Sequence, residues 1–476
     1  MAWLRVLVEF LNVCFFFYML AYSVFLFMSA IGGAVAMHRK AKTRTFRRKM
    51  YLYHDDNYIP VSILVPAYNE EVTILDTVHS LRQMDYPEYE IIVVDDGSSD
   101  DTARKLIEEF HLIKAERPIQ RRIPTKKAVS VWESVGEGAR ITLICKENGG
   151  KADALNMGIN ASRYSHFVSI DADSVLQPTA VRRMMEAFLE DKRVVACGGM
   201  IQIANQAAIV NGEVKEQYFP KKIIVLLQML EYCRSFLGSR ILFDFWGGNM
   251  IISGACGMFK KELVLRCGGY DSDIIGEDME LVVKLHHFCR SNRIDYKIVH
   301  EQEAICWTQV PESLNDLRKQ RRRWHTGMIQ SIMLHRDIIF NPEYGLVSFF
   351  SMTYYLLMEC LGPLIEIIGA INIVLAIWLE MIDYEFMITY FFLFIFFSAV
   401  VTMITFFSRM YITSSRATEV KLSQVVMVIA FSFIECLGFR QLISIFRTSA
   451  FFNYRKNKKE WGKITRKEHN RGVTNE

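Results

Sequence analysis

The feature that most constrains this chain is a long apolar segment near its N-terminus. No residue from Phe10 to Met37 is charged, and Phe, Leu, Val and Met dominate this segment of about 28 residues. A helix of this length crosses a bilayer core of about 30 Å with some tilt. A signal peptide is the competing interpretation, but the run is too long for one and lacks a convincing cleavage site. We therefore predict a retained transmembrane helix within residues 1–37.

Further apolar stretches lie near the C-terminus, roughly over residues 346–379, 386–407 and 422–445. Gly362 and Pro363 interrupt the first, which fits either an interfacial helix followed by a span or two spans. The third fits a span or a helix that turns along the membrane surface. These stretches contain charged residues, which are costly in lipid and indicate either a polar channel or pairing between helices: Glu359, Glu366, Glu435 and Arg440.

The distribution of basic residues predicts how the chain is oriented. The net charge is only +4 over 476 residues, which does not favour a nucleic-acid partner. Lys and Arg gather instead at 38–49 and 455–467, beside apolar segments, as expected of cytoplasmic anchors on a lipid bilayer. An even number of crossings, two or four, must then follow the soluble region, and the basic segment 409–421 favours two. We predict a multi-pass protein of the plasma (cytoplasmic) membrane with its soluble domain in the cytoplasm.

These patterns divide the chain into five parts. We expect an N-terminal transmembrane helix at 1–37, a basic linker at 38–54, a soluble domain at 55–335, transmembrane and interfacial helices at 336–453, and a basic tail at 454–476. The ten cysteines are scattered singly, without a CxxC pair, so neither a disulfide framework nor a zinc site is indicated.

The soluble part alternates between short β-branched strands and helical segments. Strands are expected over 61–65, 91–94, 141–144 and 167–170, with helical patterns between them. This alternation predicts an α/β domain around a mostly parallel sheet, whose ligands bind beyond the carboxyl ends of the strands. The basic stretch 114–127 interrupts the pattern and is expected to be a surface loop.

Two acidic motifs directly follow predicted strands. Asp171 and Asp173 are spaced two apart, as suits a hard divalent cation whose coordination shell is completed by phosphates. Such a cation would neutralise a departing diphosphate. Asp95 and Asp96 follow their strand in the same way and suit hydrogen bonds to a base or a ribose. Helix capping is the alternative for both motifs.

Three further motifs carry candidate chemistry. Lys151 follows Gly149-Gly150 at the start of a helix, where phosphate is favoured, although no Walker A pattern is present. Asp278 precedes a helical pattern and is a candidate general base, with helix capping as the alternative. Arg323 and Trp324, in Gln-Arg-Arg-Arg-Trp, suit contacts with a diphosphate and a sugar face, or anchoring at the membrane surface.

In this order, the motifs resemble those of the family 2 glycosyltransferases, most closely the processive branch of membrane polysaccharide synthases. The resemblance covers roughly residues 58–335, and it rests on the whole ordered set because each motif alone is weak. The motifs span residues 65–70, 95–98, 171–173, 253–259, 268–271, 276–278 and 320–324.

The resemblance implies a GT-A (Rossmann-like) α/β fold and an enzyme that uses a UDP-sugar, UDP-N-acetylglucosamine or UDP-glucose. Donor contacts would come from Pro66, Ala67, Tyr68, Glu70, Asp95, Asp96, Lys151 and Asp171. Asp173, with Asp171, would bind Mg2+ or Mn2+, and Asp278 would be the general base of an inverting displacement. A polysaccharide or glycolipid acceptor and the diphosphate would contact Glu277, Gln320, Arg323 and Trp324. A β-linked polymer would leave through the membrane helices, with or without an export or regulatory subunit.

Three functions stay open on the sequence alone: a processive synthase, a transferase that adds one sugar to a lipid or glycan, and a non-catalytic export subunit. The Gln-Arg-rich-Trp motif before apolar spans favours the first, although single-addition relatives share it. The complete set of carboxylates disfavours the third. Gly276 departs from the Thr of many synthases. Asn205, Asn211 and Trp246 are candidate pocket-wall residues for sugar choice.

Overall fold

The computed structural model describes residues 2–47, 57–136, 138–205, 207–210, 213–217, 219–413 and 422–453. The expected basic tail, part of the basic linker, residues 414–421 and Asn211 lie outside the described residues.

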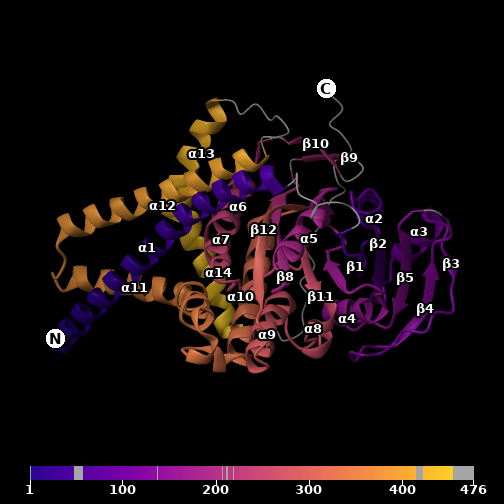
Figure 1. Cartoon of the computed structure of the whole chain (residues 1–476). Helices are drawn as coiled ribbons and strands as arrows, with labels where there is room; N and C mark the ends of the chain where they lie inside the picture. The colour runs from indigo at the N-terminus through magenta and orange to yellow at the C-terminus, as the bar shows by residue number, and fades with distance from the viewer. Residues whose placement is uncertain are drawn as a thin grey trace.

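The soluble part is built on one mixed sheet of ten strands in the order β3-β4-β5-β2-β1-β6-β11-β8-β12-β7 (Figure 1). The strands are β1 (Val61–Ala67), β2 (Tyr89–Asp95), β3 (Ile113–Lys114), β4 (Ala128–Glu133), β5 (Arg140–Lys146), β6 (His166–Ser169), β7 (Val175–Leu176), β8 (Val194–Ile203), β11 (Gly257–Lys260) and β12 (Lys297–Thr308). A separate antiparallel hairpin is formed by β9 (Ala207–Val210) and β10 (Glu213–Gln217).

The four strands predicted from the sequence pair in parallel at the centre, but the sheet as a whole is mixed and not mostly parallel as predicted, because strands such as β4 and β11 join it in antiparallel pairings. Strand β1 pairs in parallel with β2 and with β6, and β2 pairs in parallel with β5. The carboxyl ends of these four strands therefore meet at one edge of the sheet, where ligands bind in such folds. Both acidic motifs follow strands that end at this edge.

Helices cover both faces of the sheet because alternate strand residues point to opposite sides. Ile63 and Val65 pack in one core with α2 (Ile74–Leu81), α3 (Thr102–Glu109) and α5 (Ala180–Glu190). Leu64 packs in a second core with α4 (Lys151–Ala161), α8 (Lys261–Arg266) and α9 (Glu277–Ser291). These layers confirm the predicted α/β class.

The basic stretch 114–127 is a loop between β3 and β4, as expected, and α4 holds it in place. The amide of Asn160 accepts hydrogen bonds from the backbone N–H groups of Arg122 and Ile123 and donates to the Ile123 carbonyl. The Asp153 carboxylate accepts a hydrogen bond from the Lys126 N–H at 3.0 Å.

The remaining helices connect the sheet domain to the apolar part. Helix α6 (Ile223–Arg234) leads through a π-helical turn, Ser235–Ser239, into α7 (Arg240–Asp244), and α10 (Leu314–Leu334) follows β12. Ser313 caps α10 by accepting the Asp316 N–H at 3.1 Å.

Among the described residues, three helical segments are long and apolar enough to cross a membrane: Ala2–Ala36 in α1 (Ala2–Arg47), Tyr384–Arg409 in α12 (Tyr384–Thr413), and Leu422–Phe452. The last comprises α13 (Leu422–Ile434), a π-helical turn and α14 (Arg440–Asn453). A fourth candidate is bent by 50° between Val347–Cys360 and α11 (Gly362–Trp378). This break lies at the predicted Gly362-Pro363 interruption. Helix α1 continues to Arg47, through the first part of the expected linker.

Candidate active site

A cavity of about 1590 Å³ opens at the carboxyl edge of the parallel strands and continues toward the apolar helices. Every predicted motif except 268–271 contributes lining residues, and these include most of the predicted site residues: Pro66, Ala67, Tyr68, Glu70, Asp96, Lys151, Asp171, Asp173, Glu277, Asp278, Gln320, Arg323 and Trp324. Of the predicted site residues, Asp95 is the exception. The fold thus brings together side chains that lie up to about 250 residues apart in the sequence.

The first acidic motif shapes the backbone around the cavity. Asp95 is buried and accepts the Ser98 N–H at 3.3 Å, so it closes the turn after β2. Burial raises the pKa of Asp95. Asp96 accepts the N–H groups of Gly149 and Gly150 at 3.0 and 2.7 Å. Asp96 therefore fixes the Gly-Gly turn that starts α4.

Lys146 is a residue of this site that the sequence analysis missed. Its fully buried ammonium lies between two carboxylates, bonded to Asp96 and paired with Asp153 at 2.6 Å. Burial of a charge is costly unless it is paired in this way. The available signal was a Lys that ends an otherwise apolar strand.

Tyr68 and Glu70 both line the cavity just after β1, but their side chains differ in exposure. The Tyr68 side chain is half exposed, at 49%, and so has a free ring surface. Glu70 is buried, and its carboxylate accepts the Thr73 hydroxyl at 2.9 Å at the start of α2. Tyr68 is thus the better placed of the two to contact a nucleotide.

Lys151 joins the acidic groups of two distant motifs. Its ammonium lies 2.6 Å from an Asp171 oxygen and 3.1 Å from a Glu277 oxygen. Burial acts to lower the pKa of Lys151, but the carboxylates of Asp171 and Glu277 outweigh it and raise the pKa above its ordinary value. Gly254 leaves room for this cluster, since a Cβ there would lie 2.9 Å from the Lys151 Nζ.

Asp171 and Asp173 form a pair of oxygen donors on the turn after β6. Burial, together with the neighbouring Asp171, raises the pKa of Asp173 to about 6. A divalent cation would relieve this repulsion, and carboxylate oxygens suit Mg2+ or Mn2+. Within the described parts of the chain, no group of three or more His, Cys, Asp or Glu residues could hold a metal. Ligand oxygens would have to complete the shell of a cation held by this pair.

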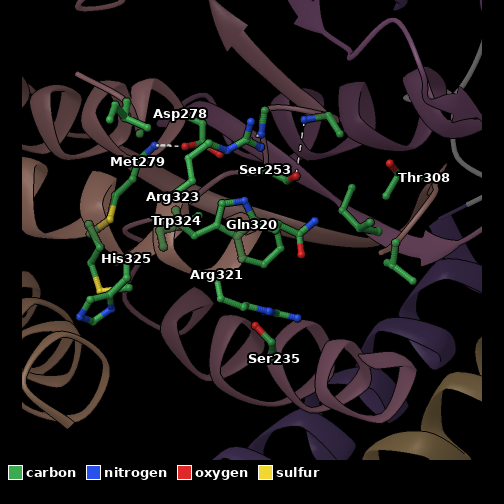
Figure 2. Close-up of a pocket in the computed structure, with 18 of the residues that line it drawn as sticks. Ser235, Ser253, Asp278, Met279, Thr308, Gln320, Arg321, Arg323, Trp324 and His325 are labelled. Atoms are coloured by element: carbon green, nitrogen blue, oxygen red, sulfur yellow. Dashed lines mark hydrogen bonds between the residues drawn. The ribbon is translucent and has the colours of Figure 1, made fainter. Parts of the chain in front are cut away.

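Asp278 lies in the first turn of α9, at the cavity wall. One carboxylate oxygen accepts the Gly254 N–H at 3.2 Å and the other accepts the Met279 N–H at 2.8 Å. Figure 2 shows the side chain of Arg323 pointing toward that of Asp278. A carboxylate so placed can accept a proton from a group bound in the cavity.

The Gln-Arg-Arg-Arg-Trp motif lies on α10, and its arginines differ in role. Arg321 makes two hydrogen bonds of 2.9 Å to Glu231 of α6, and its guanidinium lies 4.7 Å from the Trp324 ring centroid. The Trp324 side chain is 42% exposed and lies centrally among the lining residues in Figure 2. Arg321, for which the sequence predicts no role, therefore supports the ring that lines the cavity.

Of the residues expected to select the sugar, Asn205 lines the cavity and Trp246 does not. Asn205 lines the cavity, but its amide donates to the Val310 carbonyl at 2.9 Å and accepts the Val310 N–H at 2.7 Å, so it holds the loop after β12. Trp246 donates to the Ser351 hydroxyl at 3.0 Å and packs against Phe243, away from the cavity lining. Neither position supports a part in sugar choice.

The charged residues of the apolar segments both pair between segments and line the cavity, so they fit helix pairing as well as a polar channel. Each carboxylate pairs with an arginine of another segment: Glu359 with Arg447 at 2.9 Å, Glu366 with Arg440 at 3.6 Å, and Glu435 with Arg234 at 2.7 Å. All six residues also line the cavity. The far end of the cavity is therefore polar, with compensated charges.

Comparison with known proteins gives a consistent result. The family described as Glycosyl transferase family 2 matches residues 62–264, and Glycosyl transferase family group 2 matches residues 166–412. The poly-beta-1,6-N-acetyl-D-glucosamine synthase of Staphylococcus epidermidis is 31% identical over 313 residues, and that of Staphylococcus aureus strain COL is 30% identical.

These alignments cover 66% of this chain and 65% of each synthase, slightly less than two thirds of the relatives' own length. Among solved structures, mannosyltransferase PcManGT from Pyrobaculum calidifontis, in complex with GDP-Man and Mn2+, matches 93% of this chain and 100% of its own. The TM-score is 0.49 and the identity is 15%.

Proposed function

This chain belongs to glycosyl transferase family 2, and from that premise we propose that it elongates a β-linked polysaccharide from a UDP-sugar at the cytoplasmic face of the plasma membrane. The observation that carries the proposal is the shared cavity. It joins the acidic pair Asp171 and Asp173, the carboxylate of Asp278 and the ring of Trp324, and continues among the apolar helices.

The donor would occupy the part of the cavity nearest the parallel strands. Tyr68 offers an exposed ring for the nucleotide, and the Gly149-Gly150 turn lets the backbone approach closely. Asp171 and Asp173 fit a divalent cation, Mg2+ or Mn2+, which when bound would neutralise charge on the diphosphate. Lys151, already paired with Asp171, would add positive charge on the same side.

The chemical step would be a direct displacement at the anomeric carbon. The acceptor hydroxyl would lose its proton to Asp278, and its oxygen would form the new bond to that carbon. The bond from the anomeric carbon to the diphosphate would break, and UDP would leave with the electron pair. Arg323 points toward this carboxylate (Figure 2) and would help to neutralise the leaving group.

The acceptor would lie against Trp324, and the growing chain would pass into the helical part of the cavity. The relatives named above are synthases of a poly-N-acetylglucosamine, which favours UDP-N-acetylglucosamine as donor over UDP-glucose. The Glu–Arg pairs between the apolar helices carry no net charge and offer hydrogen bonds to a neutral glycan. Export through these helices, alone or with a further subunit, belongs to this proposal.

The test is to incubate the detergent-purified full chain with one UDP-sugar at a time, with Mg2+ or Mn2+, and to size the product by gel and glycanase digestion. We expect a long product from UDP-N-acetylglucosamine alone, sensitive to a glycanase that cleaves β-linked N-acetylglucosamine. A product extended by one sugar, or formed only with an added lipid acceptor, would replace polymer synthesis by single transfer. A protein that binds UDP-sugars but never transfers them would contradict both.

A further inference from the structure

Arg240 is a buried cation of the cavity wall to which no motif assigns a role. It is the first residue of α7, is 9% exposed, and lines the cavity. Its Nη1 has no hydrogen-bond partner, and no ion pair to its guanidinium is found within the described parts of the chain. The arginines at the far end of the cavity differ, because Arg234, Arg440 and Arg447 are each paired with a glutamate.

An unpaired buried guanidinium costs several kcal/mol relative to one in water, so its presence needs an explanation. The Phe236 ring offsets part of this cost, since the guanidinium carbon lies 3.8 Å from the ring centroid. A cation–π contact leaves the N–H donors in the guanidinium plane without acceptors. The site is therefore incomplete as a hydrogen-bonding group until a ligand supplies an oxygen.

The residues around the cavity near Arg240 indicate what kind of ligand would supply this oxygen. Asp278, Tyr232 and Tyr355 line the same cavity as Arg240. Tyr232 also lies beside Trp324, with ring centroids 6.5 Å apart. Arg240 thus lines the same cavity as the proposed base and the aromatic group proposed to face the acceptor.

On the basis of the proposed function, we propose that Arg240 is an acceptor-binding residue that donates a hydrogen bond to an oxygen of the acceptor's terminal sugar, a neutral hexose or N-acetylhexosamine. The guanidinium offers five N–H donors in a fixed plane. A sugar hydroxyl can accept from Arg240 while a hydroxyl of the same unit donates to Asp278. The rings of Tyr232 and Tyr355, which line the cavity, would pack against the apolar faces of the sugar.

A neutral sugar fits better than an anion such as a lipid phosphate. Asp278 and the neighbouring Glu277 line the same wall, and their charge would repel an anion. Farther along the cavity the arginines are already neutralised by Glu359, Glu366 and Glu435. An anionic acceptor would therefore find little uncompensated positive charge along that end.

The test compares acceptor use with donor use in the full-length protein in detergent. Arg240→Met removes the donors but keeps much of the side-chain volume, and Arg240→Lys keeps the charge. With wild-type product formation established, we expect Arg240→Met to raise the KM for an added β-linked N-acetylglucosamine oligosaccharide by about tenfold or more. The KM for the UDP-sugar should stay within about twofold of the wild-type value. The acceptor KM of Arg240→Lys should lie between those of the wild type and Arg240→Met.

Arg117→Met is the control, because Arg117 is a partly buried arginine that bonds Glu133 at 3.1 Å and does not line this cavity. It should leave both KM values unchanged. An unchanged acceptor KM in Arg240→Met, or equal rises in donor and acceptor KM, would overturn the acceptor role. If Arg240→Met does not fold, the acceptor KM of Arg240→Lys decides by the same criterion. Wild-type protein that transfers no sugar would instead contradict the proposed function.

Discussion

Asp278 has two backbone hydrogen bonds that an amide can largely keep, which makes its substitution informative. In Asp278→Asn the side-chain oxygen can still accept the Gly254 or Met279 N–H, so the fold of this turn should persist. Loss of the proton acceptor should lower kcat by about 10²-fold or more. The rate of UDP release measures this, while competition by UDP measures donor binding, which should be retained.

Asp271→Asn is a suitable control for Asp278→Asn, because Asp271 precedes the same helix but does not line the cavity. Its turnover should match that of the wild type. Turnover above about a tenth of the wild-type value in Asp278→Asn would remove Asp278 as the base, because a general base contributes at least about a hundredfold.

Trp324 presents a ring to the cavity while Arg321 and Glu231 hold it from behind. Trp324→Ala removes the ring and leaves that ion pair in place. We expect the acceptor KM to rise by about two- to tenfold and the donor affinity to change little, since an aromatic contact contributes about 0.5–1.5 kcal/mol.

Trp132→Ala controls for the loss of an indole, because Trp132 lies on β4, away from the cavity lining. Kinetics of elongation with a titrated oligosaccharide acceptor separate the two variants. If the acceptor dependence of Trp324→Ala equals that of wild type, Trp324 does not stack on the acceptor.

At the scale of residues, the sequence predicted which side chains belong to the site better than it predicted what those side chains bond to. The carboxylates of both acidic motifs were identified because they follow apolar strands directly. Their different roles were not identified. Asp96 holds the Gly149-Gly150 turn, and the fully buried Lys146 neutralises the charge of Asp96. Arg240 gave no signal in the sequence, because its environment is made by segments far from it in the chain.

At the scale of elements, the crossing of α9 and α10 sets the distance between Asp278 and Trp324. The two helices meet at Gly276 and Gly327, where a Cβ on Gly327 would lie 2.6 Å from the Gly276 Cα. A side chain at Gly276 would likewise meet the Gly327 Cα at 2.8 Å. The departure of Gly276 from the expected Thr therefore has a physical reason in this chain.

Gly327→Ala should force these helices apart, because the contact is between backbones that have no rotamer to change. Overpacking of this kind costs about 1–3 kcal/mol, even though Ala suits a helix interior better than Gly. We expect a lower Tm and a lower kcat/KM, measured by thermal unfolding in detergent and by UDP release.

The matched control is Gly438→Ala, where the added Cβ meets nothing within 4 Å. It should change neither quantity. A Gly327→Ala protein with wild-type Tm and kcat/KM would show that this helix crossing tolerates separation and does not set the geometry of the site.

Elements were predictable where the apolar pattern was local. The four parallel strands lie close to where alternation with helices placed them, and the helix break lies at Gly362-Pro363. Strands β8, β11 and β12 were not predicted. They pair with strands distant in sequence, partly antiparallel, so no local period shows their neighbours.

At the scale of the whole molecule, the apolar helices divide into two sets. In Figure 1, α1, α11 and α12 extend alongside one another away from the sheet, whereas α13 and α14 run across them. Helix α14 contacts α10 and α11, and α1 contacts both α11 and α12. Glu435, Arg440 and Arg447 of the crossing segment all face charged partners.

This arrangement favours a chain that crosses the membrane at α1, α11 and α12, with α13–α14 lying along the cytoplasmic surface. Although α13–α14 is long and apolar enough to span, its charged residues and its contact with α10 fit an interfacial position. Two crossings then follow the soluble domain, and the basic tail returns to the same side as that domain. The distribution of basic residues predicts the same orientation, and this stays a prediction.

Single cysteines can test this topology, introduced in a Cys14→Ser background because Cys14 is exposed. Positions Thr418 and Thr474 flank α13–α14, and Tyr384 lies at the start of α12. A membrane-impermeant maleimide should label Thr418→Cys and Thr474→Cys in inside-out vesicles, and Tyr384→Cys only in intact cells. The Cys14→Ser parent, measured in both preparations, gives the background from the native cysteines. Labelling of Thr418→Cys and Thr474→Cys from opposite sides would make α13–α14 a span, because the two positions can face the same side only if the helix between them does not cross.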